Sequence, residues 1–435
     1  MGMMLSGTIF AVVYLLIATE KLEKTIAVII GAFLMLLLRL IPFHEAAGAI
    51  DFNVIFLLVG MMVCINVLSK TGFFEWISMT IAKKTDGNPM HIMILFIVIT
   101  AVVSAFLDNV TTVILMAPVT ILITQILEIS PIPFLILEAI ASNIGGATTL
   151  IGDPPNILIG SQAKLSFNDF LINLAPCIIV VLLATVIIVY LFFRKRWNIT
   201  EQIKVRVTGS LPHLAIVDSK NMKRSLIVLG LILLAFVTHT LTGLEPGIIA
   251  LSGAMFMVLV CKGEIDKDLM HIEWGVIFFF IGLFMLVAGL EYNGFISFLA
   301  DKIMAIAGTN VFMLCMIVLF ASALFSSVLD NIPFVMAMIP LIKNVISSIS
   351  HAQGISDPVF IASHIAQPLW WALALGACLG GNGTLIGASA NVVVSKIASK
   401  NKYPITFWQF TRYGFPLMLL SIIISAVYLW LRYFI

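Results

Sequence analysis

The stretch TTLIGDPPNILIGS, residues 148–161, places a single acid, Asp153, between a glycine and two prolines inside an apolar region. Proline removes a backbone donor and glycine tolerates unusual backbone conformations, so no continuous helix is expected through this stretch. Inside a membrane, irregular backbone is tolerated only where it lines a cavity or is buried in protein. The stretch therefore predicts a helix that is broken at a binding site.

A second copy of this stretch lies in the C-terminal half, as GTLIGASANVVVS at residues 383–395. Residues 144–156 match residues 379–391, which are 235 positions further along the chain. Earlier in the chain, residues of several unrelated types recur 222 positions apart: Glu23 and Glu245, Gly60 and Gly282, Asp108 and Asp330, and Asn109 and Asn331. An offset shared by such different residues predicts an internal duplication.

The composition excludes a soluble protein. Of the 435 residues, 61% are hydrophobic and 11% are charged, whereas a soluble domain carries roughly 25% charged residues. Apolar segments of the length that crosses a bilayer, about 20 residues, recur along the chain. The predicted fold class is an all-α polytopic membrane protein. The net charge of +2 gives no indication of nucleic-acid binding.

Each half predicts the same order of elements: scaffold helices, a short amphipathic helix along the membrane interface, a re-entrant hairpin, a broken helix and a last helix. In the first half, 1–193, these lie at 4–69, 73–84, 91–128, 132–163 and 172–193. In the second half, 225–435, they lie at 225–290, 295–307, 311–350, 361–398 and 414–434. A basic linker, 194–224, joins the halves and is expected in the cytoplasm.

About ten transmembrane helices are expected, five in each half. Because five is odd, the second half should insert upside down relative to the first. Inverted repeats with broken helices are typical of secondary transporters, whose sites lie near the midplane of the membrane. With the linker inside, nineteen lysines and arginines, Lys24 among them, fall on the cytoplasmic side and five outside. Both termini are then outside, in what is expected to be a prokaryotic inner membrane.

Asp108 and Asp330 each interrupt an apolar segment of almost full spanning length. A carboxylate at that depth is costly unless it faces a polar cavity, binds a cation or holds a proton. Each could also be the N-cap of the second hairpin arm, and both interpretations can hold together. The predicted ligands are the polar side chains at the two tips and two breaks: Asp108, Asn109, Thr111, Thr112, Asn143, Thr148, Thr149, Asp153, Asn156, Asp330, Asn331, Asn382, Thr384, Ser389 and Asn391.

Seven glycines are expected to unwind the broken helices: Gly145, Gly146, Gly152, Gly380, Gly381, Gly383 and Gly387. Close helix packing would explain glycines alone, but it does not explain why Asp, Asn and Thr residues stand next to them. Glu138, just before the first break, is either a proton carrier or a polar contact nearer the surface. The five cysteines lack metal-binding spacing, so no metal or cofactor is predicted beyond H⁺ or Na⁺ as coupling ion. Whether Cys378 lines the site is left open.

The strings FLDNVTTVILMAPVT, residues 106–120, and ASNIGGATTLIGDPPNILIGS, residues 141–161, resemble the ArsB/NhaD family of the ion transporter superfamily. The likeness is strongest to its arsenite-permease-like and P-protein-like branch. It implies an elevator-type homodimer, in which the early helices of each half form a scaffold. The hairpins and broken helices would then move together as a transport domain.

The expected function is secondary active transport, as a proton-coupled antiporter of the arsenite and antimonite efflux type. A site with two or three carboxylates repels a dianion, which lowers the rank of dicarboxylate transport. A Na⁺/H⁺ antiporter is the alternative, and a Na⁺-coupled dicarboxylate or anion transporter, or an anion channel, is a further one. An enzyme is not expected, because the sequence shows no nucleophile–base pair. The expected partners are the lipid bilayer, a small inorganic or organic solute and a second copy of the chain.

Overall fold

The computed structural model describes residues 2–19, 22–194 and 211–435, together with Trp197, Thr200, Ile203, Arg206 and Gly209 in the linker. Every regular element in these residues is a helix. Among the described helices, nine are long and apolar enough to cross a membrane. The chain is therefore an all-helical membrane protein. Part of the predicted linker, 194–224, lies outside the described residues.

The helices of the first half follow the predicted order. Their bounds are α1 (Gly2–Ala18), α2 (Lys24–Leu37), α3 (Phe43–Gly48), α4 (Phe52–Ser69), α5 (Phe73–Lys84), α6 (Pro89–Ser104), α7 (Asn109–Ile126), α8 (Ile132–Gly146), α9 (Pro154–Ala163) and α10 (Phe167–Phe193). The chain is not helical between α6 and α7 or between α8 and α9. These two interruptions fall at the LDN and GDPP stretches that predicted them.

The second scaffold helix is shorter than the apolar segment 24–42, which predicts a helix over that range. α2 ends at Leu37 instead of near residue 42, because Arg39 adopts a left-handed φ of 55° and Pro42 follows. A separate short helix, α3, comes next. With 17 and 14 residues, α1 and α2 are shorter than the span of about 20 residues that a bilayer requires. Of the three scaffold crossings expected in this half, only α4 is among the helices of spanning length.

The described part of the linker includes a short 3₁₀ helix, η1 (Pro212–Ala215). The second half then contains α12 (Ser219–Thr242), α13 (Pro246–Cys261), α14 (Ile265–Met270), α15 (Trp274–Tyr292), α16 (Phe295–Ala307), α17 (Val311–Val328), α18 (Asn331–Ala352), α19 (Pro358–Phe360), the π-helix η2 (Ile361–Ala366), α20 (Gln367–Gly380), α21 (Ser389–Lys400) and α22 (Phe407–Tyr433).

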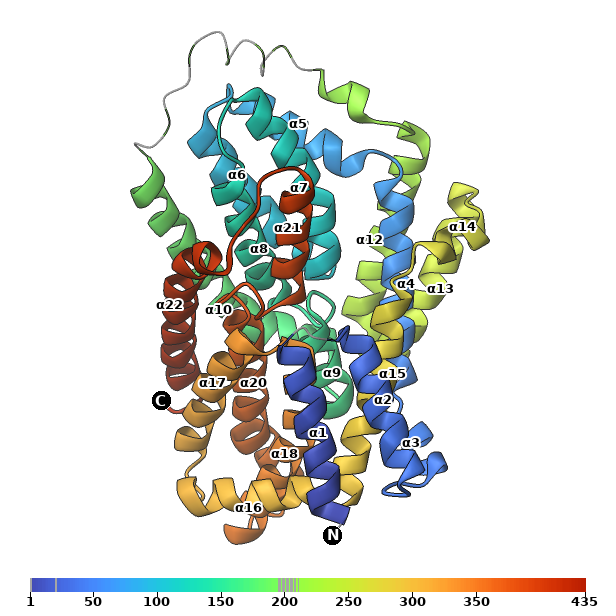
Figure 1. The fold of residues 1–435 in the computed structure, drawn as a ribbon, viewed down its shortest axis with the longest axis vertical. Coiled ribbons are helices and arrows are strands. Elements are labelled where there is room, and N and C mark those ends of the chain that lie inside the picture. Colours follow the sequence, from blue (N-terminus) through green and yellow to red (C-terminus); the bar gives the residue numbers. More distant parts are fainter. Residues whose placement is uncertain are drawn as a thin grey trace.

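The helix starts of the two halves correspond. α4, α5 and α6 begin 222 residues before α15, α16 and α17, and α8 and α9 begin 235 residues before α20 and α21. α5–α7 lie at one end of the molecule and α16–α18 at the opposite end (Figure 1). The helices are thus arranged as two related sets. That the two sets cross a membrane in opposite directions stays a prediction.

The helices pack as two groups. In the first, which we call the scaffold (α1–α4 and α12–α15), α4 packs against α13 and α2 against α15. In the second, which we call the hairpin domain (α6–α10 and α17–α22), α6 packs against α8 and α17 against α20. The broken helices exchange their second segments between the halves: α21 packs against α7 and α8, and α9 packs against α18 and α20. This exchange brings both breaks and both hairpin tips to the middle of the hairpin domain.

Candidate functional site

Each hairpin tip is an acid that caps a helix. Asp108 precedes α7, and its Oδ1 accepts hydrogen bonds from the backbone N–H groups of Val110 at 2.9 Å and Thr111 at 3.0 Å. Its Oδ2 accepts the hydroxyl of Thr111. Asp330 caps α18 in the same way, through the N–H of Ile332 at 3.2 Å. Both acids therefore cap the second arm of their hairpin. In each, only one carboxylate oxygen accepts hydrogen bonds from the backbone.

Each break is closed by an asparagine, and the two asparagines stand at equivalent positions of the repeat. The Asn156 amide donates to the carbonyls of Gly146 at 3.3 Å and Thr149 at 2.9 Å. The Asn391 amide donates to Gly381 at 2.8 Å and Thr384 at 3.0 Å. Carbonyls that an ended helix leaves without partners are satisfied in this way. Asn156 and Asn391 thus hold the unwound loops, and are fully buried.

A threonine within each break binds the end of a hairpin arm. The hydroxyl of Thr149 donates to the carbonyl of Ala105, and that of Thr384 to the carbonyl of Ser327 at 2.5 Å. Glycine is required within the loop: a Cβ on Gly152 would lie 2.6 Å from the carbonyl oxygen of Gly146. Each broken helix is therefore fixed to the hairpin of its own half as well as to itself.

One asparagine connects the halves. Asn143 Oδ1 accepts from the amide of Asn109 at 3.0 Å. Its Nδ2 donates to Asn382 Oδ1 at 2.9 Å and to Asn391 Oδ1 at 3.0 Å. The first tip, the first break and the second break thus share one buried amide network. Among the described residues, the Nδ2 of Asn382 is buried without a partner, which leaves one donor at this point for a ligand.

The second tip reaches the first break through Asp153. The amide of Asn331 lies 3.4 Å from both carboxylate oxygens of Asp153. Asp153 is fully buried, and the charges of Asp330 and Asp108 both act on it. The described residues place no lysine or arginine within ion-pair distance of Asp153 or Asp108.

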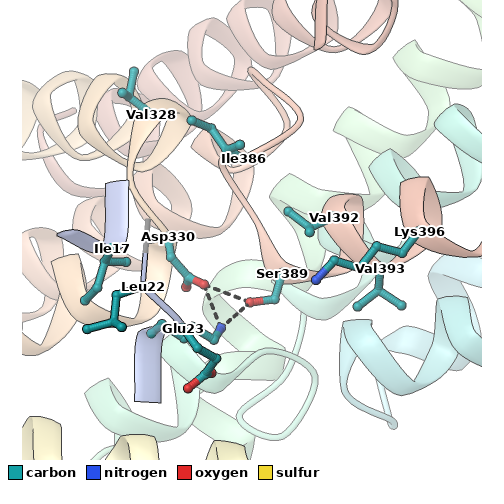
Figure 2. A pocket seen from close by; sticks show the side chains of 11 residues that line it. Ile17, Leu22, Glu23, Val328, Asp330, Ile386, Ser389, Val392, Val393 and Lys396 are labelled. Carbon is teal, nitrogen blue, oxygen red and sulfur yellow. Dashed lines mark hydrogen bonds and ion pairs between the residues drawn. The ribbon is translucent and has the colours of Figure 1, made fainter. Parts of the chain in front are cut away.

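The predicted ligands do not all face the same space. A pocket of about 420 Å³ reaches Asp330 and Ser389, and continues along α21 to Lys396 (Figure 2). Neither Asp108 nor Asp153 lines it. Thr112 donates its hydroxyl to the Asp108 carbonyl at 2.9 Å, as a structural contact. Thr148 and Thr111 are partly exposed. In the described residues, no three His, Cys, Asp or Glu side chains form a metal-binding group.

Lys24 is the site residue that sequence reasoning missed. It was counted among the cytoplasmic charges, but its ammonium donates to Asp330 Oδ2 at 2.9 Å and to Ser389 Oγ at 2.7 Å. Ser389 in turn donates to Asp330 Oδ2 at 2.8 Å. Counting charges cannot single it out, because the count does not show that the start of α2 lies beside the second tip and the second break. No sequence signal marks this position except that its counterpart in the second half is Pro246.

Cys378 lies in the network, though not in the pocket. Its thiol donates to Asn156 Oδ1 at 3.5 Å, and the side chain is fully buried. It stands 235 residues after Asn143, which makes the corresponding contact to Asn391 in the other half. The repeat offset was therefore a signal that could have placed Cys378 beside the first break.

Glu138 lies outside the amide network. It is 1% exposed, and its Oε1 accepts the hydroxyl of Thr120 at 2.6 Å. Its Oε2 has no partner among the described residues. The carboxyl is thus in the protein interior, and whether it carries a proton stays a prediction.

Comparison with known proteins places the chain in a family. The family model described as citrate transporter matches residues 14–376. The chain belongs to the citrate transporter family. This family is part of the ion transporter superfamily, to which the sequence motifs pointed. The narrower resemblance to the ArsB/NhaD family stays a prediction.

Relatives of this citrate transporter family protein are similar over nearly the whole chain. A Mycobacterium tuberculosis protein named as an uncharacterized transporter is 40% identical over 432 residues, which cover 98% of both chains. A Synechocystis uncharacterized transporter is 31% identical over 443 residues, covering 98% of this chain and 96% of the relative. The human P protein is 31% identical over 507 residues, covering 98% of this chain and 59% of its own. These relatives indicate a transporter.

A solved structure shares the fold. The YdaH transporter of Alcanivorax borkumensis superimposes with a TM-score of 0.59 at 14% identity, covering 89% of this chain and 88% of that one. At this identity the likeness concerns the fold alone.

Proposed function

We propose that this protein is a proton-coupled secondary transporter that works as an antiporter, with an uncharged or cationic solute of the arsenite or antimonite type. The observation that carries the proposal is the charge of the site. Asp108, Asp153 and Asp330 lie at the tips and the first break, and Lys24 is the one lysine or arginine of the described residues that forms an ion pair with any of them. With the acids ionised, the site has a net negative charge, which favours protons, cations and neutral hydrogen-bonding solutes over anions.

Neutral ligands complete the site. The free amide donor of Asn382, the amide of Asn331 and the hydroxyls of Thr111 and Ser389 supply donors for a trihydroxide or acceptors for a cation. Binding of the solute and protonation of the acids would exclude each other, because both compete for the same carboxylate oxygens. Such competition produces exchange of solute for protons.

The hairpin domain would carry the site across the membrane as a unit. The buried amide network connects the helices of this domain with one another. Its contacts with the scaffold include polar ones, such as that of Lys24 with Asp330. We propose an elevator movement of this domain against a scaffold that forms a homodimer. The pocket beside α21 would be the present access path, from the side of the linker.

Na⁺/H⁺ antiport is the second candidate. Carboxylates, amide oxygens and backbone carbonyls at helix ends are the ligands of small hard cations, and the tips and breaks contain groups of all three kinds. A citrate-like anion is the third candidate, favoured by the family model. For that anion to bind, the acids would have to be protonated or occupied by a cation, since like charges at this depth repel strongly.

The experiment is flux into proteoliposomes that contain the purified protein, under an imposed pH gradient. Arsenite, Na⁺ and citrate are offered in turn, and proton movement is followed with a pH-sensitive dye. We expect arsenite or Na⁺ to move against the proton flux. Asp108→Asn and Asp330→Asn should keep the helix caps, because asparagine caps as well as aspartate does, while gradient-driven flux falls by about tenfold or more.

Two results would overturn the proposal. One is uptake of citrate together with Na⁺ that neither substitution changes. The other is a steady current without a solute gradient, which would indicate a channel.

A further inference from the structure

The contact between Lys24 and Asp330 joins two groups of helices that the proposed function requires to move apart. Lys24 is the first residue of α2 in the scaffold. Asp330 caps α18 and Ser389 is the first residue of α21, both in the hairpin domain. The three polar atoms form a closed triangle, with distances of 2.9, 2.7 and 2.8 Å. Figure 2 shows these contacts at the wall of the pocket. This triangle is therefore a contact between domains, within reach of solvent.

A second contact holds the same tip. The hydroxyl of Tyr14, in α1, donates to the backbone carbonyl of Pro333 in α18. The Lys24 ammonium also lies 5.1 Å from the centre of the Phe279 ring, in α15. The scaffold thus supplies a fixed position for the lysine, and the N-terminal pair α1–α2 contacts the second tip.

Among the residues that the structure describes, the first tip has no such partner. The repeat positions of Lys24 and Ser389 are Pro246 and Pro154, neither of which can donate a hydrogen bond. Asp108 instead satisfies its Oδ2 with Thr111 of its own helix. Of two tips built on the same plan, one is neutralised by a lysine of the scaffold, and the other has no lysine or arginine within ion-pair distance among the described residues.

We infer that Lys24 is a built-in counter-cation for the second tip, which Asp330 must exchange for a proton or another cation whenever the hairpin domain leaves the scaffold. The inference rests on the proposed function. Its physical reason is that the pair is mostly shielded, with the Lys24 side chain 27% exposed and that of Asp330 12% exposed. Removing one partner of such a pair leaves the other charge uncompensated in a poorly solvated place.

Other titratable groups, from several of the elements around the pair, act on Lys24 and Asp330. Glu23 stands beside Lys24 and caps α2, and Glu273, which precedes α15, lies within electrostatic range of Lys24. Asp153 and Tyr14 are within range of Asp330, and Lys396 lines the same pocket. With four acids and two lysines in this region, counting Asp330 and Lys24 themselves, the departure of Lys24 makes the site more negative. Uptake of a proton or cation by Asp330 restores the balance.

The transport test compares Lys24→Gln and Lys24→Arg with the unchanged protein in the same proteoliposomes. Lys24→Gln should leave Asp330 to be neutralised from solution in both positions of the domain. The ratio of protons moved to solute moved should then change by about one, since a carboxylate takes one proton. Lys24→Arg should restore the original ratio, whereas Lys24→Gln combined with Asp330→Asn should not, because that variant also lacks the carboxylate. An unchanged ratio in Lys24→Gln would overturn the inference.

A stability test does not depend on transport. The melting temperature of the purified protein in detergent is measured between about pH 5 and about pH 9. An unpaired, buried carboxylate is destabilising when ionised and tolerated when protonated. The deficit of Lys24→Gln relative to the unchanged protein should therefore grow as the pH rises, and should vanish in the double variant with Asp330→Asn. A deficit that is the same at all pH values would contradict the inference.

The two tests separate the failures. If the unchanged protein moves no solute against any gradient, the proposed function fails, while the pH-dependent deficit still decides whether Lys24 neutralises Asp330. If transport is proton-coupled, but Lys24→Gln keeps the original ratio and its stability deficit does not change with pH, the inference alone fails.

Discussion

Four asparagine side chains do different tasks in the centre of this molecule. Asn156 and Asn391 repeat the same pair of carbonyl contacts in the two halves. Asn143 and Asn382 have no asparagine at their repeat positions, and they meet each other between the halves. The duplicated amides thus support the backbone, and the unduplicated ones connect the halves and leave a free donor. Function in a duplicated protein is to be sought where the two copies differ.

Glu138 is another such difference, since its repeat position is Leu373. We predict that Glu138→Gln retains the contact with Thr120 and the folded structure, because glutamine has nearly the same shape. If Glu138 carries a proton, flux driven by a pH gradient should fall by about tenfold or more, while solute exchange without a gradient continues. Proteoliposome flux under both conditions measures this.

The control for that prediction is Glu128→Gln. Glu128 is exposed and pairs with Arg206 at 3.0 Å on the surface, so its replacement should change neither flux. Full gradient-driven flux in Glu138→Gln would show that the carboxyl has only a structural role.

At the residue scale, the sequence predicted which residues form the site better than it predicted the contacts between them. The acids, amides and threonines of the tips and breaks were predicted, and the structure brings most of them into one network. Lys24 could not be found, because its role depends on where the start of α2 lies relative to the starts of α18 and α21. Nor could the sequence tell that Thr112 and Asn156 bind backbone carbonyls, since a polar side chain in an apolar segment has the same pattern whether it faces a ligand or its own helix.

At the scale of elements, the broken helices fit against the hairpins only through glycine. A Cβ on Gly145 would lie 2.0 Å from the carbonyl oxygen of Ala101 in α6, and one on Gly380 would lie 2.6 Å from the Ala323 Cα in α17. Both contacts are with backbone, which cannot rotate away. The two halves therefore use the same close approach between a hairpin arm and a broken helix.

We predict that Gly145→Ala lowers the stability of the protein by about 1–3 kcal/mol, the usual cost of overpacking. Thermal unfolding in detergent measures the change. Gly230→Ala is the matched control: Gly230 is also in a helix, α12, but a Cβ there has nothing within 4 Å. Alanine at that position should raise stability by up to about 1 kcal/mol. Equal effects of the two substitutions would contradict the close-packing account.

Element order and most helix bounds could be read from the sequence, because glycine, proline and the capping acids mark where helices stop. The bounds of α5 coincide with the predicted 73–84. The early end of α2 could not be foreseen, since leucines continue to residue 40 and only the left-handed conformation of Arg39 ends the helix. Apolar composition alone does not fix where an element stops.

At the scale of the whole molecule, the scaffold and the hairpin domain touch at two repeat-related places. One is the pocket at Asp330. The other is a pocket of about 630 Å³ that includes Asp51 and Asn53 of the α4 region and Ser161 of α9. There Ser161 donates to Asp51 at 2.6 Å, and the Asn53 amide lies 3.5 Å from Ser161 Oγ. Movement of the hairpin domain must break these contacts as well as that of Lys24.

A cross-link tests that movement. With the native cysteines replaced by alanine, Asn53→Cys with Ser161→Cys should form a disulfide that stops flux, and reduction should restore it. The control pair is Ser425→Cys with native Cys177 retained, where Sγ and Oγ are 3.6 Å apart within the hairpin domain. That cross-link should leave flux unchanged. Continued flux with the first pair oxidised would exclude a moving domain.

The most direct test of the central claim, that acids at the tips and the first break couple solute to protons, is made on Asp153. Solute accumulation driven by a pH gradient is measured for the unchanged protein and for Asp153→Asn, with solute binding measured in parallel. We predict that the variant binds solute yet accumulates about tenfold less of it, because the break has lost its titratable group. Accumulation by Asp153→Asn that equals that of the unchanged protein, at the same pH gradient, would contradict the account.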